Sequence, residues 1–114
     1  MPKYDAICLR HMLDAALEVM RFTRGKSRDN LETDRQLVLA LAKSIEIIGE
    51  AASKISLERR KLMPRIPWEN IIGMRNRLIH AYFDIDLNIL WKTIIEDIPP
   101  LIMELGKAIP PNGL

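Results

Sequence analysis

Residues 73–83 read Gly-Met-Arg-Asn-Arg-Leu-Ile-His-Ala-Tyr-Phe, and the rest of the chain is organised around them. This stretch brings two guanidinium groups, an amide, an imidazole and a phenol together in Arg75, Asn76, Arg77, His80 and Tyr82. Arginine offers a planar fork of donors that suits a phosphate, and histidine gains or loses a proton near neutral pH. The residues therefore predict a site that acts on a phosphodiester. His80 would move a proton on a ribose hydroxyl, and Arg75 would stabilise the charge that grows on the phosphate.

The spacing of these residues needs comparison with helix geometry. At about 100° per residue, Asn76 and His80 fall about 40° apart, whereas Arg75 and His80 fall about 140° apart. Arg75 and His80 can converge if the arginine wraps round the helix, if the helix ends near His80, or if a second copy of the chain supplies part of the site. We favour the last arrangement, in the cleft of a symmetric dimer. The residues alone give equal weight to a plainer interpretation, in which the arginines are surface charges and His80 is favoured by the helix dipole.

Composition describes an ordinary soluble domain. The chain has 114 residues, of which 48% are hydrophobic and 28% charged, with a formal net charge of +2. We expect a single domain over 1–114, with an ordered core over about 4–106 and a tail over 107–114. A net charge this small does not create a general field for nucleic acid, so any such binding must come from local basic patches.

The content of cysteine, histidine and apolar residues limits the compartment and the cofactor. Cys8 is the only cysteine, so no internal disulfide can form, and this favours the cytoplasm. The start of the chain has no signal-peptide pattern, and the longest apolar run, 37–42, is too short to span a membrane. Two histidines and one cysteine without paired ligand spacing predict no metal site and no metal cofactor. There is also no phosphate-binding glycine loop.

Apolar periodicity predicts helices throughout the chain. We expect them over 4–22, over 33–55, from Ser56, from Pro67 through the central stretch, and from Asp86 with a restart at the Pro99-Pro100 pair. No alternating pattern indicates a strand. The predicted fold class is all-α: an antiparallel bundle of four main helices plus a short connecting helix, forming a homodimer.

Local signals add detail to the predicted helix over 33–55. Thr33 and Gln36 have the spacing of a capping box. Gly49 lies in the helix interior, where glycine often allows another helix to approach closely. Glu46 and Glu50 lie on one flank. We interpret them as solvated charges, with the alternative that Glu50 orients a basic residue of the site.

A basic patch of Arg59, Arg60, Lys61 and Arg65 precedes the central stretch. Arg59, Arg60 and Lys61 follow one another just after Ser56. They are candidates for contacts with an RNA backbone, as is Arg77 in the central stretch. The alternative for the patch, a solvated helix face, carries more weight from the sequence.

The central stretch resembles the Arg-x4-His-x-Tyr motif of the HepT-like toxins, which belong to the HEPN (higher eukaryote and prokaryote nucleotide-binding) superfamily. Arg75, His80 and Tyr82 occupy the motif positions. The segments 47–52 and 68–69 also look like that family, and the resemblance covers about residues 4–106.

The resemblance implies more than the spacing shows. HepT-like proteins are helical dimers whose two motifs face one cleft, and they act as metal-independent ribonucleases. Arg75 and His80 would be catalytic, with Asn76 supporting, and the ribose 2′-hydroxyl would attack the adjacent phosphate and leave a 2′,3′-cyclic phosphate. The RNA substrate could be tRNA. The partner would be an MntA-type nucleotidyltransferase antitoxin, which transfers AMP to the motif tyrosine, here Tyr82, and blocks RNA.

Three functional hypotheses follow. The leading one is an RNA-cleaving toxin of a type VII-like toxin–antitoxin system. The second is a non-catalytic nucleotide- or partner-binding helical module, which shares the fold but uses no chemistry at His80. The third is a purely structural helical dimer, which leaves the cluster in 73–83 unexplained.

Overall fold

The chain is mostly helical, as its periodicity predicts. A computed structural model describes residues 2–81 and 83–109. Within them lie seven helices and two short strands, in the order α1 (Lys3–Thr23), α2 (Asn30–Thr33), α3 (Arg35–Ser53), α4 (Leu57–Leu62), α5 (Trp68–Leu78), β1 (Ile79–Ala81), β2 (Asp84–Ile85), α6 (Leu87–Glu96) and α7 (Ile98–Ala108). The predictions for Tyr82 and for residues 110–114 lie outside the described residues.

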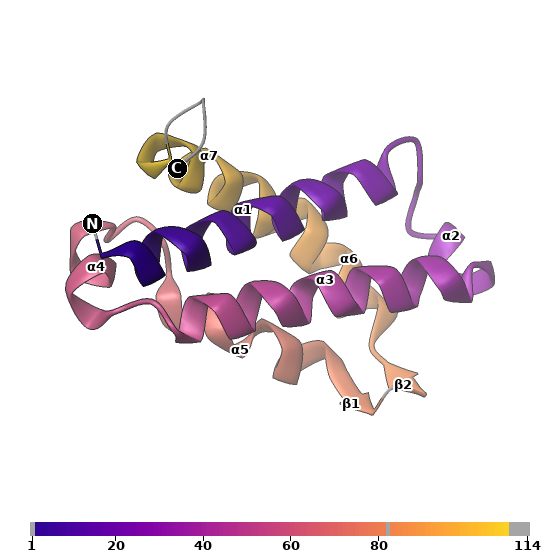
Figure 1. Cartoon of the computed structure of the whole chain (residues 1–114). Helices are drawn as coiled ribbons and strands as arrows, with labels where there is room; N and C mark the ends of the chain where they lie inside the picture. Colours follow the sequence, from indigo (N-terminus) through magenta and orange to yellow (C-terminus); the bar gives the residue numbers. More distant parts are fainter. Residues whose placement is uncertain (1, 82, 110–114) are drawn as a thin grey trace.

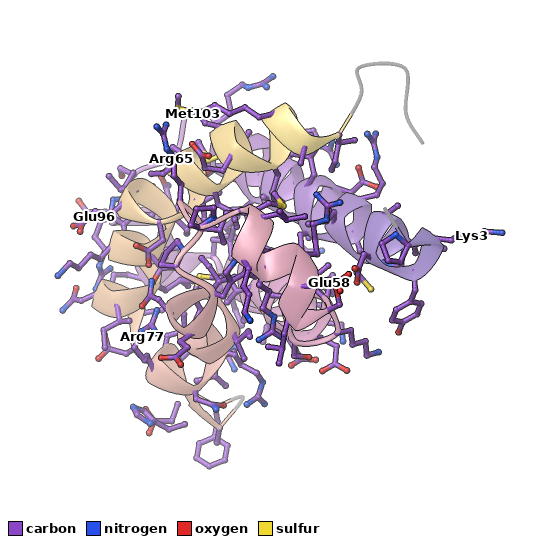
Figure 2. All side chains as sticks on the ribbon, turned by 90° about the vertical axis from the view of Figure 1, so that its left-hand side faces the viewer. Lys3, Glu58, Arg65, Arg77, Glu96 and Met103 are labelled. Carbon is purple, nitrogen blue, oxygen red and sulfur yellow. The ribbon has the colours of Figure 1, made fainter. Side chains whose placement is uncertain are left out.

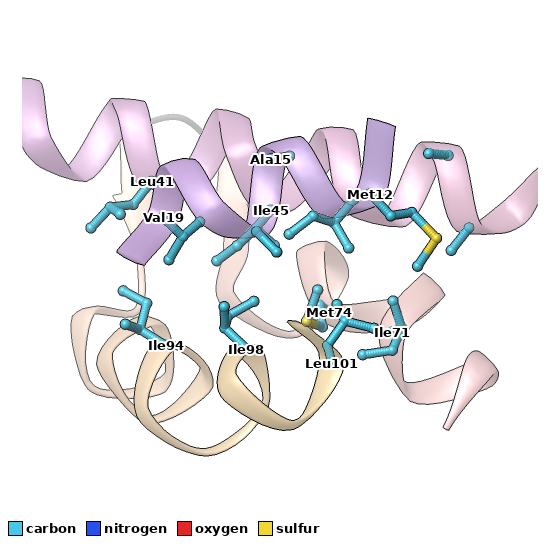
Figure 3. Close-up of a cluster of buried hydrophobic side chains, with 14 of the residues drawn as sticks. Met12, Ala15, Val19, Leu41, Ile45, Ile71, Met74, Ile94, Ile98 and Leu101 are labelled. Carbon is cyan, nitrogen blue, oxygen red and sulfur yellow. The ribbon is translucent and has the colours of Figure 1, made fainter. Parts of the chain in front are cut away.

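Two long antiparallel helices, α1 and α3, form the frame of the molecule (Figure 1). The shorter α5 runs along α3 on one side, and α7 packs against α1 on the other. Apolar side chains from α1, α3, α5, α6 and α7 meet in one core, among them Met12, Val19, Ile45, Met74 and Ile98 (Figure 3). The short α4 connects α3 to α5, as predicted for the connecting helix.

Several predicted helix boundaries are confirmed. Ser56 caps α4, because its hydroxyl accepts a hydrogen bond from the Arg59 backbone N–H at 3.2 Å. Asp86 caps α6 in the same way, accepting from the Ile89 backbone N–H at 3.0 Å. The proline pair lies in the first turn of α7, where a missing N–H removes no helical hydrogen bond.

The expected start of the helix over 33–55 is wrong. Thr33 ends α2, and α3 begins at Arg35. Asp34 caps α3, because its carboxylate accepts a hydrogen bond from the Leu37 backbone N–H at 3.0 Å. A carboxylate at a helix N-terminus also interacts favourably with the helix dipole, so Asp34 is a stronger cap than the threonine before it.

The expectation of no strands is also wrong. β1 and β2 pair antiparallel, with Ile79 opposite Ile85 and Ala81 opposite Asp84. The Asp86 backbone N–H continues the pairing by donating to the Leu78 carbonyl at 2.8 Å. These strands are too short to show an alternating pattern, and they satisfy backbone groups between the end of α5 and the start of α6.

A buried carboxylate ties α1 to the start of α4. Asp5 is only 3% exposed. Its two oxygens accept hydrogen bonds from the Ser56 hydroxyl at 2.6 Å and from the Ser56 backbone N–H at 2.9 Å. These two hydrogen bonds hold the pKa of the Asp5 carboxyl below its usual value. The same residue, Ser56, therefore caps one helix and anchors another.

Three further features concern Cys8, the end of α7 and the length of the helices. Cys8 is buried on α1 and has no disulfide partner. Helix α7 continues to Ala108 and Ile109 is buried. Residues 107–109 of the expected tail therefore belong to the packed structure. None of the described helices is both long and apolar enough to cross a membrane.

Candidate active site

Arg75 lies in the last turn of α5 and reaches across to α3. Its Nε is 3.1 Å from Oε2 of Glu46, and its NH1 donates to Oδ1 of the neighbouring Asn76 at 3.4 Å. The side chains of Arg75 and Glu46 are 38% and 26% exposed. The guanidinium is therefore oriented by an ion pair that is only partly screened by solvent.

An open cleft of about 420 Å³ lies between α3 and α5 at this pair. Arg75 and Asn76 line it from α5, and Glu46, Gly49 and Glu50 line it from α3. A cleft of this size, with two donor groups at its wall, has room for a phosphate and its neighbouring atoms.

The predicted close approach at Gly49 is confirmed, and it determines which side chains of α3 and α5 meet at the site. A Cβ added at Gly49 would lie 3.2 Å from the Ile72 carbonyl oxygen, which is tighter than ordinary van der Waals contact. The antiparallel helices α3 and α5 thus cross at Gly49 and Ile72. Glu46 precedes Gly49 by three residues and Arg75 follows Ile72 by three, so the crossing places these two side chains opposite each other.

Glu46, and not Glu50, orients the basic residue of the central stretch. The carboxylate of Glu50 lies 3.4 Å from the Lys54 ammonium, on the same helix. Glu46 holds Arg75 through Oε2 and the Lys43 ammonium through Oε1, at 3.1 Å each. Both glutamates lie on the expected flank of the helix. Only the register of α3 against α5 decides which glutamate meets Arg75. That register cannot be predicted from the spacing of residues along one helix.

His80 belongs to a strand and not to the helix that carries Arg75. Because α5 ends at Leu78, the helical angle between Arg75 and His80 does not apply. The pairing shifts between Ile79 and Ala81, so His80 has no residue directly opposite it and forms a β-bulge. Bulges redirect side chains and are frequent beside active sites. The His80 side chain is exposed and has no hydrogen-bond partner among the described residues.

The end of α5 is one of the three arrangements by which Arg75 and His80 could converge. A helix that stops three residues after Arg75 allows the next residues to turn away from the helical path. The motif thus spans a helix–strand junction. Arg75 and Asn76 lie on its helical side, and His80 follows on its extended side.

A family model described as "Ribonuclease HepT-like" matches residues 12–108. The chain belongs to this HepT-like family of the HEPN superfamily. The resemblance seen in the central stretch therefore extends over most of the chain.

Relatives of the HepT-like family include proteins named as ribonucleases. A "Probable ribonuclease HepT" of Thermococcus cleftensis is 40% identical over 93 residues, which cover 82% of this chain and 84% of the relative. A protein of Caldanaerobacter subterraneus named a "Putative RNase" is 38% identical over 101 residues, covering 89% and 90%. Another "Putative RNase", from Methanocaldococcus jannaschii, is 36% identical over 97 residues, covering 85% and 89%. No solved structure matches the chain significantly.

Arg77 lies away from the cleft between α3 and α5. Its NH1 donates to the Asn70 carbonyl at 3.0 Å, and its NH2 is 3.9 Å from the carboxylate of Asp97 (Figure 2). Asp97 follows the end of α6, so Arg77 faces the junction of α6 and α7. The structure separates the two arginines of the central stretch and places only Arg75 in the cleft.

The basic patch at Arg59, Arg60 and Lys61 has a structural component. Arg60 donates from Nε to the Ile55 carbonyl at 3.1 Å and from NH2 to the Ser53 carbonyl at 3.0 Å, which closes the end of α3. Arg59 is partly buried, and its Nε has no hydrogen-bond partner among the described residues. Lys61 is exposed. The structure thus gives Arg60 a role in the fold and keeps Lys61 accessible on the surface.

Two further predictions concern residues beyond this cleft. The expected modification site, Tyr82, lies outside the described residues. Within the described part of the chain, no three His, Cys, Asp or Glu side chains are grouped so that they could hold a metal ion.

Proposed function

We propose that the chain is an endoribonuclease toxin that cleaves RNA without a metal ion, using Arg75, Asn76 and His80. One observation supports this most directly. The ion pair with Glu46 holds Arg75 at the wall of an open cleft, and His80 is exposed on the bulged strand immediately beyond the same helix. Membership of the HepT-like family supports RNA as the substrate.

The reaction we propose begins at a ribose 2′-hydroxyl. His80 accepts the hydroxyl proton, and the 2′-oxygen forms a bond to the adjacent phosphorus. The bond from phosphorus to the 5′-oxygen breaks, and that oxygen takes up a proton from an imidazolium. The products are a 2′,3′-cyclic phosphate and a 5′-hydroxyl, so atoms and protons balance.

Arg75 and Asn76 have separate tasks in this proposal. The guanidinium of Arg75 stabilises the negative charge that accumulates on the phosphate oxygens in the transition state. The amide of Asn76 accepts from Arg75 through Oδ1, which leaves its NH2 group as a donor toward the substrate. Lys61 and Arg59 are proposed contacts for the RNA backbone farther from the reacting phosphate.

A homodimer completes the site in this proposal. Arg75 of one protomer and His80 of the partner subunit would act on the same phosphate across a shared cleft. To test this, Arg75→Ala and His80→Ala subunits are mixed after partial unfolding and refolded together. If the two residues act across the interface, part of the cleavage rate returns. No recovery above the separate variants would place a complete site within each chain.

A nucleotidyltransferase antitoxin of the MntA type would silence the toxin. The partner would transfer AMP from ATP to the Tyr82 oxygen and release pyrophosphate. The added charge and bulk would lie two residues from His80 and would oppose RNA binding. Intact mass after incubation with ATP and the partner should rise by one or more AMP units, and Tyr82→Phe should abolish the rise. A rise that persists in this variant would place the modification at another residue.

The decisive experiment is RNA cleavage in the presence of EDTA, in the cytoplasmic pH range. The purified chain is incubated with tRNA and with total RNA, alongside His80→Ala. We expect cyclic phosphate ends from the parent and a cleavage rate lowered by about 10² to 10⁴ in the variant. Arg77→Ala is the matched control, because Arg77 lies on the same helix but faces away from the cleft.

Each outcome has a clear meaning. Cleavage that is lost in His80→Ala and retained in Arg77→Ala would establish metal-free chemistry at this motif. Cleavage that requires a divalent ion would contradict the proposed mechanism. A parent of unmodified mass that cleaves neither RNA would favour the non-catalytic nucleotide- or partner-binding module.

A further inference from the structure

We infer that Glu46 is a positioning residue for catalysis, which fixes the Arg75 guanidinium and does not contribute to RNA binding. The inference rests on the proposed ribonuclease function and deepens it. It assigns a role to a residue outside the Arg-x4-His-x-Tyr motif, on a different helix and 29 positions before Arg75.

The contact itself has the geometry of an orienting interaction. Glu46 meets Arg75 at Nε, the nitrogen closest to the side-chain stem, at 3.1 Å. A partner at this nitrogen restricts rotation about the last side-chain bonds and so sets the plane of the guanidinium. Arginine has several rotatable bonds, and without a partner its planar group would sample many orientations.

The carboxylate is itself held in place. Its second oxygen, Oε1, lies 3.1 Å from the Lys43 ammonium. Its backbone is fixed by the close crossing of α3 and α5 at Gly49, one turn away. Glu46 is thus a fixed carboxylate between two cations. Its position on α3 determines where the Arg75 guanidinium lies.

The charge of Glu46 argues against a role in binding. RNA is a polyanion, and a carboxylate at the wall of an RNA cleft repels it. An ion pair this exposed also contributes little to stability, because solvent screens it. A carboxylate that weakens binding and adds little stability is explained by what it does to Arg75.

A positioning role for Glu46 predicts a loss of kcat without a rise in KM. In Glu46→Gln the side chain keeps its shape but loses its charge. We expect kcat to fall by about 10- to 100-fold, because a misplaced catalytic group costs rate in this range. We expect KM for RNA to stay the same or decrease, because a repulsive charge has been removed. If Glu46 had only a structural role, its substitution would instead lower the melting temperature without separating kcat from KM.

Two matched glutamates serve as controls. Glu104 also pairs with a lysine three residues along its helix, at 3.0 Å, and its side chain is 22% exposed. Glu104→Gln removes a comparable pair far from the cleft, so kcat and KM should match the parent. Glu50→Gln removes a charge from the same cleft without touching Arg75. It should alter KM in the same direction as Glu46→Gln and change kcat by less than about twofold.

A double-mutant cycle isolates the route through Arg75. In an Arg75→Ala background, Glu46→Gln should cause no further loss of kcat, because the group that Glu46 positions is absent. Independent losses that multiply would overturn the inference. Glu46→Asp provides a second variant that keeps the charge on a shorter stem, and its kcat should lie between those of the parent and Glu46→Gln.

Different results would disprove the ribonuclease function and the positioning role of Glu46. If the parent does not cleave RNA, or Arg75→Ala cleaves as the parent does, the proposed function is wrong. If Arg75→Ala loses cleavage while Glu46→Gln and Glu46→Asp keep the parental kcat, the positioning role alone is wrong. Melting temperatures of all variants show whether each is folded at the assay temperature.

Discussion

Two carboxylates of this molecule, Asp5 and Glu46, both hold neighbouring groups through polar contacts, yet they serve different ends. Asp5 is 3% exposed and accepts from the hydroxyl and the backbone N–H of one serine. Glu46 is 26% exposed and lies between two cations from different helices. Buried contacts of this kind stabilise the fold, whereas a partly exposed carboxylate contributes less to stability and can orient a neighbouring cation.

The largest effect on folding is expected at Asp5. Asp5→Asn keeps one acceptor for Ser56 but removes the charge that strengthens both hydrogen bonds. We expect the free energy of unfolding to fall by about 1–3 kcal/mol, as for other buried groups that lose a charged partner. Urea unfolding followed by circular dichroism measures it. An unchanged midpoint would show that the Asp5–Ser56 contact does not hold α1 to α4.

The contrast should also appear in the pH dependence of stability. The folded pKa of Asp5 lies below the unfolded value of about 3.9, so its contribution is complete above that value. The contribution is lost as the pH falls below the unfolded pKa and through the lower folded pKa. The stability difference between the parent and Asp5→Asn should therefore be constant from neutral pH to about pH 5 and decrease below about pH 4. A difference that widens in acid would contradict the lowered pKa.

Gly49→Ala probes the feature on which the Glu46 contact depends. Alanine favours the helix by roughly 1 kcal/mol, but its Cβ must displace the Ile72 carbonyl by a few tenths of an ångström. Crowding in a packed interface costs about 1–3 kcal/mol, so we expect a net loss of about 1 kcal/mol in stability. The shift should also lower kcat, because Arg75 moves relative to Glu46. Gly106→Ala is the control, since a Cβ at Gly106 meets no atom within 4 Å.

The smallest effect on folding is expected at Glu46. The free energy of unfolding of Glu46→Gln should change by less than about 1 kcal/mol, because both partners are partly exposed and solvent screens the pair. Measuring it beside Asp5→Asn, in the same urea series, compares the two carboxylates directly. A loss at Glu46 as large as the loss at Asp5 would remove the distinction between them.

The sequence predicts those features that depend on neighbouring residues. The apolar repeats locate the long helices, and Ser56, Asp86 and the proline pair mark where helices begin, because each acts within one turn of its own position. Gly49 indicates a close crossing because glycine within a helix is unfavourable without such a reason. Arg75, Asn76 and His80 stand out because their chemistry is concentrated in one short stretch.

Features that depend on register between elements were not predicted. The β-bulge at His80 joins strands of three and two residues, which are too short to show alternation. The choice of Glu46 over Glu50 depends on which residue of α5 faces Gly49. Arg77 resembles Arg75 in sequence, yet the turn of the helix directs it to Asp97. Each of these needs the position of a second element.

The single buried thiol of the protein, Cys8, provides a probe of local opening. Cys8 is the only cysteine and is 3% exposed, beside a pocket that Glu46 also lines, so the reaction of its thiol depends on local opening around α1. The labelling rate under native conditions therefore reports how often α1 opens. Because Asp5 anchors the same helix one turn earlier and Glu46 lines the same pocket as Cys8, the rate would respond to changes at both carboxylates.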